Sequence, residues 1–136
     1  MIQIIFGEKG TGKTKKILDL ANQSAKDAKG SVVFIDDDDS YMFDLNLAVR
    51  FINAKEYGIG GPKTFYGFLC GISASDHDLE DVYVDGFVNI VKHDLSTLEE
   101  FFRDLRAFTD AHGIRLVLAV SGAAENLPAF LQEYAL

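Results

Sequence analysis

The chain has 136 residues, 48% of them hydrophobic, and a formal net charge of −8. This length favours one domain, 1–136, with enough apolar residues for a core, and no apolar run is long enough to span a bilayer. A single cysteine excludes a disulfide framework, and no basic, cleavable leader precedes the first strand, so we expect a cytoplasmic protein without a membrane partner.

The charge is unevenly distributed along the chain. Residues 1–30 contain six lysines and three acidic residues, a net charge of +3, which leaves −11 for residues 31–136. The acidic part should repel a nucleic-acid backbone. We therefore expect no direct binding to duplex DNA.

The first predicted strand, Met1–Phe6, leads into a motif that fits G-x-x-x-x-G-K-[ST]. Glycines let successive N–H groups converge on a polyphosphate, and the start of the next helix adds partial positive charge. A glycine-rich turn with a capping threonine is the alternative, which the flanking strand and helix disfavour. In the nucleotide interpretation Lys13 neutralises the β- and γ-phosphate oxygens and Thr14 gives its hydroxyl to Mg²⁺. The predicted phosphate-binding residues are Gly7, Glu8, Lys9, Gly10, Thr11, Gly12, Lys13 and Thr14.

Apolar residues at helical spacing predict a helix over residues 12–29, with Gly30 as its C-cap, and Ser31–Ile35 reads as the next strand. A strand-loop-helix-strand unit requires a crossover and implies a parallel sheet. Four aspartates, Asp36–Asp39, follow at the strand's carboxyl end, where α/β sheets place their ligands. They form either a solvated turn or a group in which one carboxylate orients water or holds Mg²⁺ near the γ-phosphate.

Residues 41–57 fit both a strand and a helix, and β propensity favours extended structure for Val49–Ala54. A glycine-rich stretch, 57–61, predicts a loop, either a plain connection or a mobile segment over a ligand. Pro62 then starts a helix that continues through Thr64–Ser73.

The strand at Glu80–Val84 ends in Asp85, and an apolar strand that ends in aspartate is the second signature of nucleotide-hydrolysing proteins with this loop. Asp85 is therefore expected to reach the Mg²⁺ shell through water. Thr14 and Asp85 are the predicted metal residues.

A capping box at Ser96–Glu99 predicts a helix that ends at Gly113, and the apolar run Ile114–Val120 predicts a buried strand. Ser121 follows that strand, either as a turn serine or as a hydroxyl that contacts the γ-phosphate. Residues 128–136 are predicted to form a short closing helix.

By Gly7–Thr14 and Val82–Asp85 the sequence resembles the P-loop NTPases over essentially its whole length. Within them, Val33–Asp38 is similar to the second strand of RecA-like ATPases, which ends in Phe-Ile-Asp-x-Glu, with a glutamate that activates the attacking water. Asp38 occupies that position. The resemblance implies an α/β, three-layer fold with a mostly parallel sheet of four to five strands, ATP and Mg²⁺ as ligands, and catalytic roles for Lys13, Asp38 and Asp85.

Two departures from the family pattern predict slow hydrolysis. Asp38 is one bond shorter than glutamate, which weakens a base whose action depends on its placement. Gly86 stands where many relatives carry a catalytic glutamate.

The family's strand order places the last strand between the phosphate-loop strand and the Asp85 strand. The strand at Ile2–Phe6 then has an open outer side, which predicts a homo-oligomer or a protein partner there.

The leading hypothesis is a slow Mg²⁺-dependent ATPase whose nucleotide state alters assembly or partner binding. The alternatives are a nucleotide-responsive interaction module without turnover and a small-molecule kinase, for which the four arginines are few and dispersed. ATP is favoured over GTP because no Asn-Lys-x-Asp signature is present.

Overall fold

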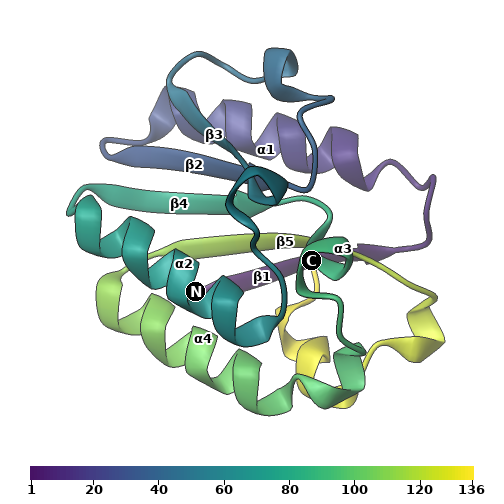
Figure 1. Cartoon of the computed structure of the whole chain (residues 1–136). Helices are drawn as coiled ribbons and strands as arrows, with labels where there is room; N and C mark the ends of the chain where they lie inside the picture. The colour runs from purple at the N-terminus through teal and green to yellow at the C-terminus, as the bar shows by residue number, and fades with distance from the viewer.

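Five parallel strands form the central sheet of the computed structural model, which describes all 136 residues (Figure 1). Their order in space is β1-β5-β4-β2-β3. The last strand therefore lies between β1 and β4, as the family resemblance implied, and β1 and β3 are the edges. The strands are β1 (Ile2–Gly7), β2 (Ser31–Asp36), β3 (Val49–Asn53), β4 (Leu79–Val84) and β5 (Arg115–Ser121).

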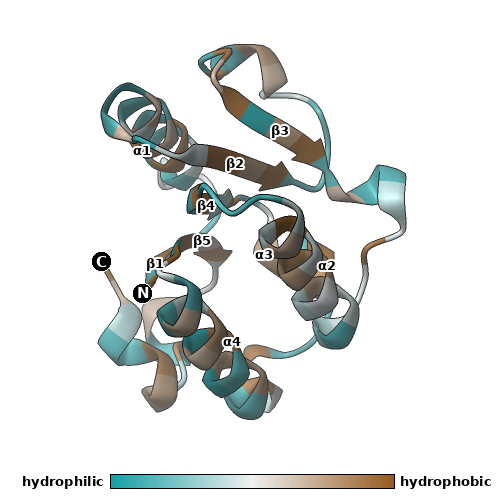
Figure 2. Ribbon diagram, turned by 90° about the vertical axis from the view of Figure 1, so that its left-hand side faces the viewer, coloured by the Kyte–Doolittle hydropathy of each residue, from teal (hydrophilic) through white to brown (hydrophobic).

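Helices cover both faces of the sheet (Figures 1 and 2). This arrangement confirms the expected three-layer α/β fold. The α-helices are α1 (Lys13–Asp27), which lies alone on its face, and α2 (Pro62–Ser75), α3 (Phe87–Val91) and α4 (Glu99–His112) on the other. Short 3₁₀ helices are η1 (Met42–Asp44), η2 (Ala54–Tyr57), η3 (Leu95–Thr97), η4 (Ala124–Asn126) and η5 (Ala129–Tyr134).

Two apolar cores, one on each side of the sheet, explain why the strands are almost continuously hydrophobic. In Figure 2 the strands are mostly brown and lie between α1 and the other three helices. Phe34 of β2 belongs to the core under α1, whereas Ile35 belongs to the larger core under α2, α3 and α4. Because side chains alternate along a strand, the next residue, Asp36, returns to the α1 side. There it lies near the loop that precedes α1.

The structure confirms the extended conformation predicted within Val49–Ala54.

Gly30 was predicted to cap the C-terminus of the first helix, and the structure gives it a different role. Helix α1 ends at Asp27, and Ala28 caps it in an extended conformation. A Cβ on Gly30 would lie 2.0 Å from the carbonyl oxygen of Asp78. Gly30 is therefore required by close packing of two loops, and its prediction as a C-cap was wrong.

The predicted capping box at Ser96–Glu99 was also wrong. Helix α4 begins at Glu99 without a side-chain cap. The carboxylate of Asp94 accepts a hydrogen bond from the Ser96 N–H (3.2 Å), and Thr97 Oγ1 donates to the Asp94 carbonyl (2.6 Å). These bonds build η3 before the helix, because short polar side chains bond as readily to a local turn as to a helix start.

The final residues lie along the outer edge of β1. The predicted helix over 128–136 is the shorter η5, after which the chain is extended. Ala135 forms a parallel bridge with Ile4, and the Leu136 N–H donates to the Ile4 carbonyl (2.8 Å). The edge of β1 is thus partly covered by the chain itself. None of the helices is both long and apolar enough to span a bilayer.

Candidate functional site

The loop between β1 and α1 presents unpaired backbone donors to open space. Gly10 and Gly12 have φ angles of 85° and 87°, a region that side chains other than glycine rarely adopt. A Cβ at either position would meet nothing within 4 Å. The N–H groups of Lys13 and Thr14, at the start of α1, donate to no acceptor in the protein. Free N–H groups at a helix N-terminus suit an anion.

Inside this loop three hydrogen-bond donors converge on the carbonyl oxygen of Glu8. It accepts hydrogen bonds from the Thr11 N–H (3.3 Å), from Thr11 Oγ1 (2.6 Å) and from Lys13 Nζ (2.8 Å). Lys13 forms no ion pair with any carboxylate. Its positive charge is therefore held at the loop without being neutralised by the protein.

Thr14 and Asp85, the two predicted metal residues, come together although 71 positions separate them in the sequence. Thr14 Oγ1 donates to Asp85 Oδ2 (3.0 Å), and the Gly86 N–H donates to Asp85 Oδ1 (3.0 Å). Burial raises the pKa of Asp85, and the hydrogen bonds from Thr14 and Gly86 oppose that rise. A hydroxyl beside a carboxylate is an oxygen donor set of the kind that Mg²⁺ uses.

Of the four consecutive aspartates, only Asp36 is buried, with an exposed fraction of 3%. Its Oδ1 accepts from the Asp37 N–H (2.7 Å), while Oδ2 is buried without a hydrogen-bond partner. Burial, together with the neighbouring carboxyl groups of Asp37 and Asp85, raises the pKa of Asp36 to about 8. Composition and spacing do not distinguish Asp36 from the three aspartates that follow it. The available signal was its place as the last residue of an apolar strand that pairs with the Asp85 strand.

Asp37 and Asp38 have different surroundings. Asn89 of α3 donates to Asp37 Oδ2 (3.0 Å), and a Cβ on Gly86 would lie 2.7 Å from Asp37 Oδ1. The glycine after Asp85 therefore makes room for the Asp37 carboxylate. Asp38, the predicted water-positioning residue, is exposed, and its Oδ1 accepts from the Ser40 N–H (2.9 Å).

These groups share one pocket of about 520 Å³ at the carboxyl ends of the strands. The loop lysines and glycines form one part of its lining, and the aspartates with Asn89 form another. Ser121 belongs to the lining, at the sheet edge where the sequence placed it. The lining residues are Lys9, Gly10, Gly12, Lys13, Thr14, Asp36, Asp37, Asp38, Tyr41, Asp85, Gly86, Asn89 and Ser121.

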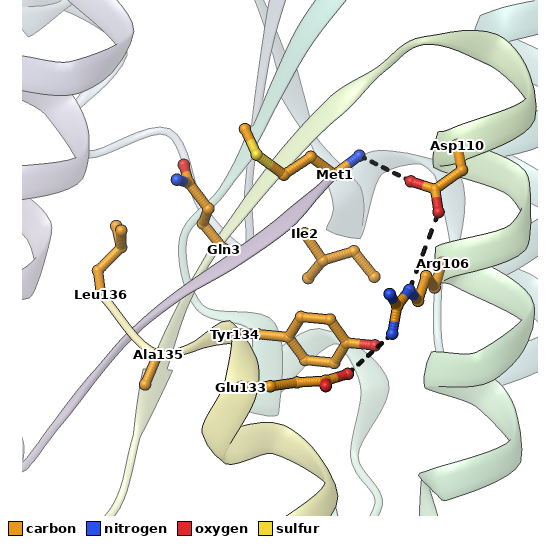
Figure 3. A pocket seen from close by; sticks show the side chains of 9 residues that line it. All are labelled: Met1, Ile2, Gln3, Arg106, Asp110, Glu133, Tyr134, Ala135 and Leu136. Atoms are coloured by element: carbon orange, nitrogen blue, oxygen red, sulfur yellow. Dashed lines mark hydrogen bonds and ion pairs between the residues drawn. The ribbon is translucent and has the colours of Figure 1, made fainter.

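A second pocket, of about 380 Å³, lies at the outer edge of β1 and differs in its charges (Figure 3). Arg106 Nη1 pairs with Glu133 Oε1 (2.9 Å), and Arg106 Nε lies 3.8 Å from Asp110 Oδ2. The amino group of Met1 lies 3.4 Å from Asp110 Oδ1. The side chains of Arg106, Asp110 and Glu133 and the amino group of Met1 are thus all paired within the protein.

No protein-family model matches the sequence, and no curated protein matches it. The fold is similar to the crystal structure of flagellar accessory protein FlaH from Methanocaldococcus jannaschii, with a TM-score of 0.55 and 15% sequence identity. The similarity covers 94% of this chain and 63% of that chain, so this chain spans less than two thirds of that protein's length. At this identity the likeness shows a shared fold.

Proposed function

We propose that residues 1–136 form one P-loop nucleotide-binding domain that binds ATP with Mg²⁺ and hydrolyses it slowly. The observation that carries this proposal is the convergence of three features in one pocket. Free N–H groups begin α1, Lys13 has no carboxylate partner, and Thr14 is bonded to Asp85. Phosphate oxygens would bind to the N–H groups and to Lys13, and Mg²⁺ would bind to the oxygens of Thr14 and Asp85. ATP is preferred to GTP because the guanine signature is absent.

Each residue has a definite part in this proposal. Lys13 neutralises phosphate charge, the N–H groups of the loop bind phosphate oxygens, and Ser121 contacts the terminal phosphate. Thr14 and Asp85 hold Mg²⁺, which when bound offsets the negative charge that develops on the phosphates.

Slow turnover follows from the groups available to position water. Asp38 lines the pocket, but it is exposed and already accepts a hydrogen bond from its own loop. Asp36 is better buried, but with a pKa of about 8 it holds a proton at neutral pH in the absence of a cation and cannot act as a base. We therefore assign water positioning to Asp38 and expect weak catalysis.

Phosphate release from the parent, Lys13→Ala and Asp38→Ala tests hydrolysis. Release by the parent that both substitutions abolish supports the ATPase. No release from a parent that still binds Mg-ATP supports the interaction module, and ATP consumption only with an added small-molecule acceptor supports a kinase. Binding itself is tested by thermal stability, because nucleotide at 100 times its Kd stabilises the folded state by about 2.7 kcal/mol. No stabilisation at millimolar Mg-ATP overturns the whole proposal.

We also propose that nucleotide state controls assembly through β1. This strand is an edge of the sheet, and its outer side pairs only at Ile4, with the last two residues of the chain. Remaining free N–H and C=O groups on that side favour pairing with a partner strand or a second copy. Light scattering with and without Mg-ATP measures this assembly. A monomer at high concentration in both conditions contradicts it.

A further inference from the structure

The Asp36 carboxylate has an oxygen for which the protein supplies no partner. Its Oδ2 is buried and accepts no hydrogen bond, and Asp36 is one of the residues that line the 520 Å³ pocket. A buried polar atom left without a partner destabilises the folded chain, and more so when it is charged. Because this cost is otherwise uncompensated, the site fits a positive partner that comes from outside the chain.

Asp37 is positioned beside this oxygen by two other segments. Asn89 of α3 holds its Oδ2, and only the missing side chain of Gly86 allows its Oδ1 to approach as closely as it does. The carboxylate is thus fixed by contacts with the turn after β4 and with the helix that follows. An aspartate in a merely solvated turn would need neither contact.

The spacing of the oxygens fits one cation. One carboxylate oxygen from each of Asp36, Asp37 and Asp38 lies within 4.8 Å of the other two. Two oxygens bound to the same ion are separated by at most twice the metal–oxygen distance, which is about 4.6–5.2 Å for Ca²⁺ and about 4.0–4.2 Å for Mg²⁺. The three oxygens are thus within reach of a single ion. Ca²⁺ accepts several carboxylates in flexible geometry, whereas Mg²⁺ dehydrates reluctantly, is usually bound through one or two carboxylates and retains water.

No positively charged group of the protein forms an ion pair with these three carboxylates. None of the chain's ion pairs includes Asp36, Asp37 or Asp38. Both oxygens of Asp85, in contrast, already accept hydrogen bonds, from Thr14 and from Gly86. The aspartate cluster and the Thr14–Asp85 pair are therefore separate sets of oxygen ligands in the same pocket.

We propose that Asp36, Asp37 and Asp38 form a binding site for a second hard divalent cation, best fitted by Ca²⁺ or Mn²⁺, distinct from the Mg²⁺ that accompanies the nucleotide. This site goes beyond the proposed function and requires no nucleotide. Its ion neutralises the acidic part of the pocket.

Calorimetric titration of the nucleotide-free chain with Ca²⁺, Mn²⁺ and Mg²⁺, after treatment with a chelator, tests the site. We expect one Ca²⁺ or Mn²⁺ per chain, with Mg²⁺ weaker. Asp36→Asn should abolish binding and Asp37→Asn should weaken it at least tenfold. Asp39→Asn removes the same charge from an exposed neighbour outside the cluster and should leave the affinity within twofold of the parent.

Two further variants separate this site from the nucleotide site. Lys13→Ala and Thr14→Ala should lose Mg-ATP binding and keep the affinity for Ca²⁺, so the two proposals can fail independently. The inference is overturned if the parent binds neither Ca²⁺ nor Mn²⁺, or if Asp39→Asn weakens binding as much as Asp37→Asn. It is also overturned if Asp85→Asn abolishes binding while Asp37→Asn has no effect. If urea unfolding shows that Asp36→Asn does not fold, Asp37→Asn decides the result alone.

Discussion

Two of the pockets of this molecule differ in how their charged groups are paired. At the carboxyl ends of the strands, Lys13 has no carboxylate partner and Asp36 has a buried, unpaired oxygen. At the outer edge of β1, Arg106 pairs with the carboxylates of Glu133 and Asp110 (Figure 3). Asp110 also pairs with the amino group of Met1. Paired surface charges contribute little to stability, whereas a buried polar atom without a partner costs stability. The difference supports the proposal that a ligand binds in the first pocket.

The largest expected effect comes from filling the space that Asp37 occupies. Gly86→Ala places a Cβ 2.7 Å from Asp37 Oδ1 on a backbone with a φ of 70°. We expect urea unfolding to show a loss of about 2–4 kcal/mol, from the left-handed conformation and the overpacking together. The variant should also bind Ca²⁺ at least tenfold more weakly.

Gly67→Ala is the control for that substitution. Gly67 lies within α2, where a Cβ meets nothing within 4 Å, so alanine should stabilise the helix by about 0.5–1 kcal/mol. If both variants have the same stability, Gly86 is not needed to seat Asp37.

Removing the unpaired ammonium group tests the loop side of the same pocket. Lys13→Ala should lose most of the stabilisation of about 2.7 kcal/mol that the parent gains from Mg-ATP at 100 times its Kd. Without nucleotide its unfolding free energy should differ little from that of the parent, since Lys13 makes no ion pair. Thermal and urea unfolding measure both quantities.

Lys16→Ala supplies the matched control. It removes an equal charge from an exposed position of α1 that does not line the pocket. An equal loss of nucleotide stabilisation in both variants would mean that general positive charge, not the placement of Lys13, attracts the ligand.

The buried carboxyl group predicts a dependence of stability on pH in the presence of a chelator. Asp36 has a folded-state pKa of about 8, against a usual value of 3.8. Between these values the folded chain keeps a proton that the unfolded chain has lost, so the free energy of unfolding falls as pH rises from 4 to 8 and levels off above.

Asp36→Asn should remove most of this decline and be more stable than the parent at pH 8, by about 1–3 kcal/mol. The raised pKa of Asp85 should leave a smaller decline of the same sign. Urea unfolding at pH 5, 7 and 9 measures the slopes, and parallel curves for the two proteins would show that Asp36 ionises normally in the folded state.

The smallest effect is expected in the pocket at the edge of β1. Arg106→Ala should destabilise the chain by less than about 1 kcal/mol, because its ion pairs lie among half-exposed side chains. Stabilisation by Mg-ATP and affinity for Ca²⁺ should not change. A change in either would show that the two pockets are coupled.

The sequence by itself determined the features that depend on neighbouring residues along the chain. Apolar runs predicted most of the strands, β propensity favoured β3, and the strand-helix-strand crossover implied a parallel sheet. The end of α4 at Gly113 follows from the left-handed conformation that glycine allows. The predicted phosphate-binding loop was visible because its glycines, Lys13 and Thr14 fall within one stretch of the sequence, Gly7–Thr14. The strand order came from the family resemblance, because spacing alone does not say which strands become neighbours.

Only the tertiary structure decided which polar residue meets which. Asp36 is distinguished from Asp38 by the register of β2 beside β4, and Gly86 matters because Asp37 approaches it across a loop. Gly30 is likewise required by its close contact with the Asp78 carbonyl, and not as the end of the helix before it. Burial, the pairing of a carboxylate oxygen and the space left by a missing side chain are set by residues distant in sequence. Composition and periodicity therefore cannot show which of four consecutive aspartates is buried and which is exposed.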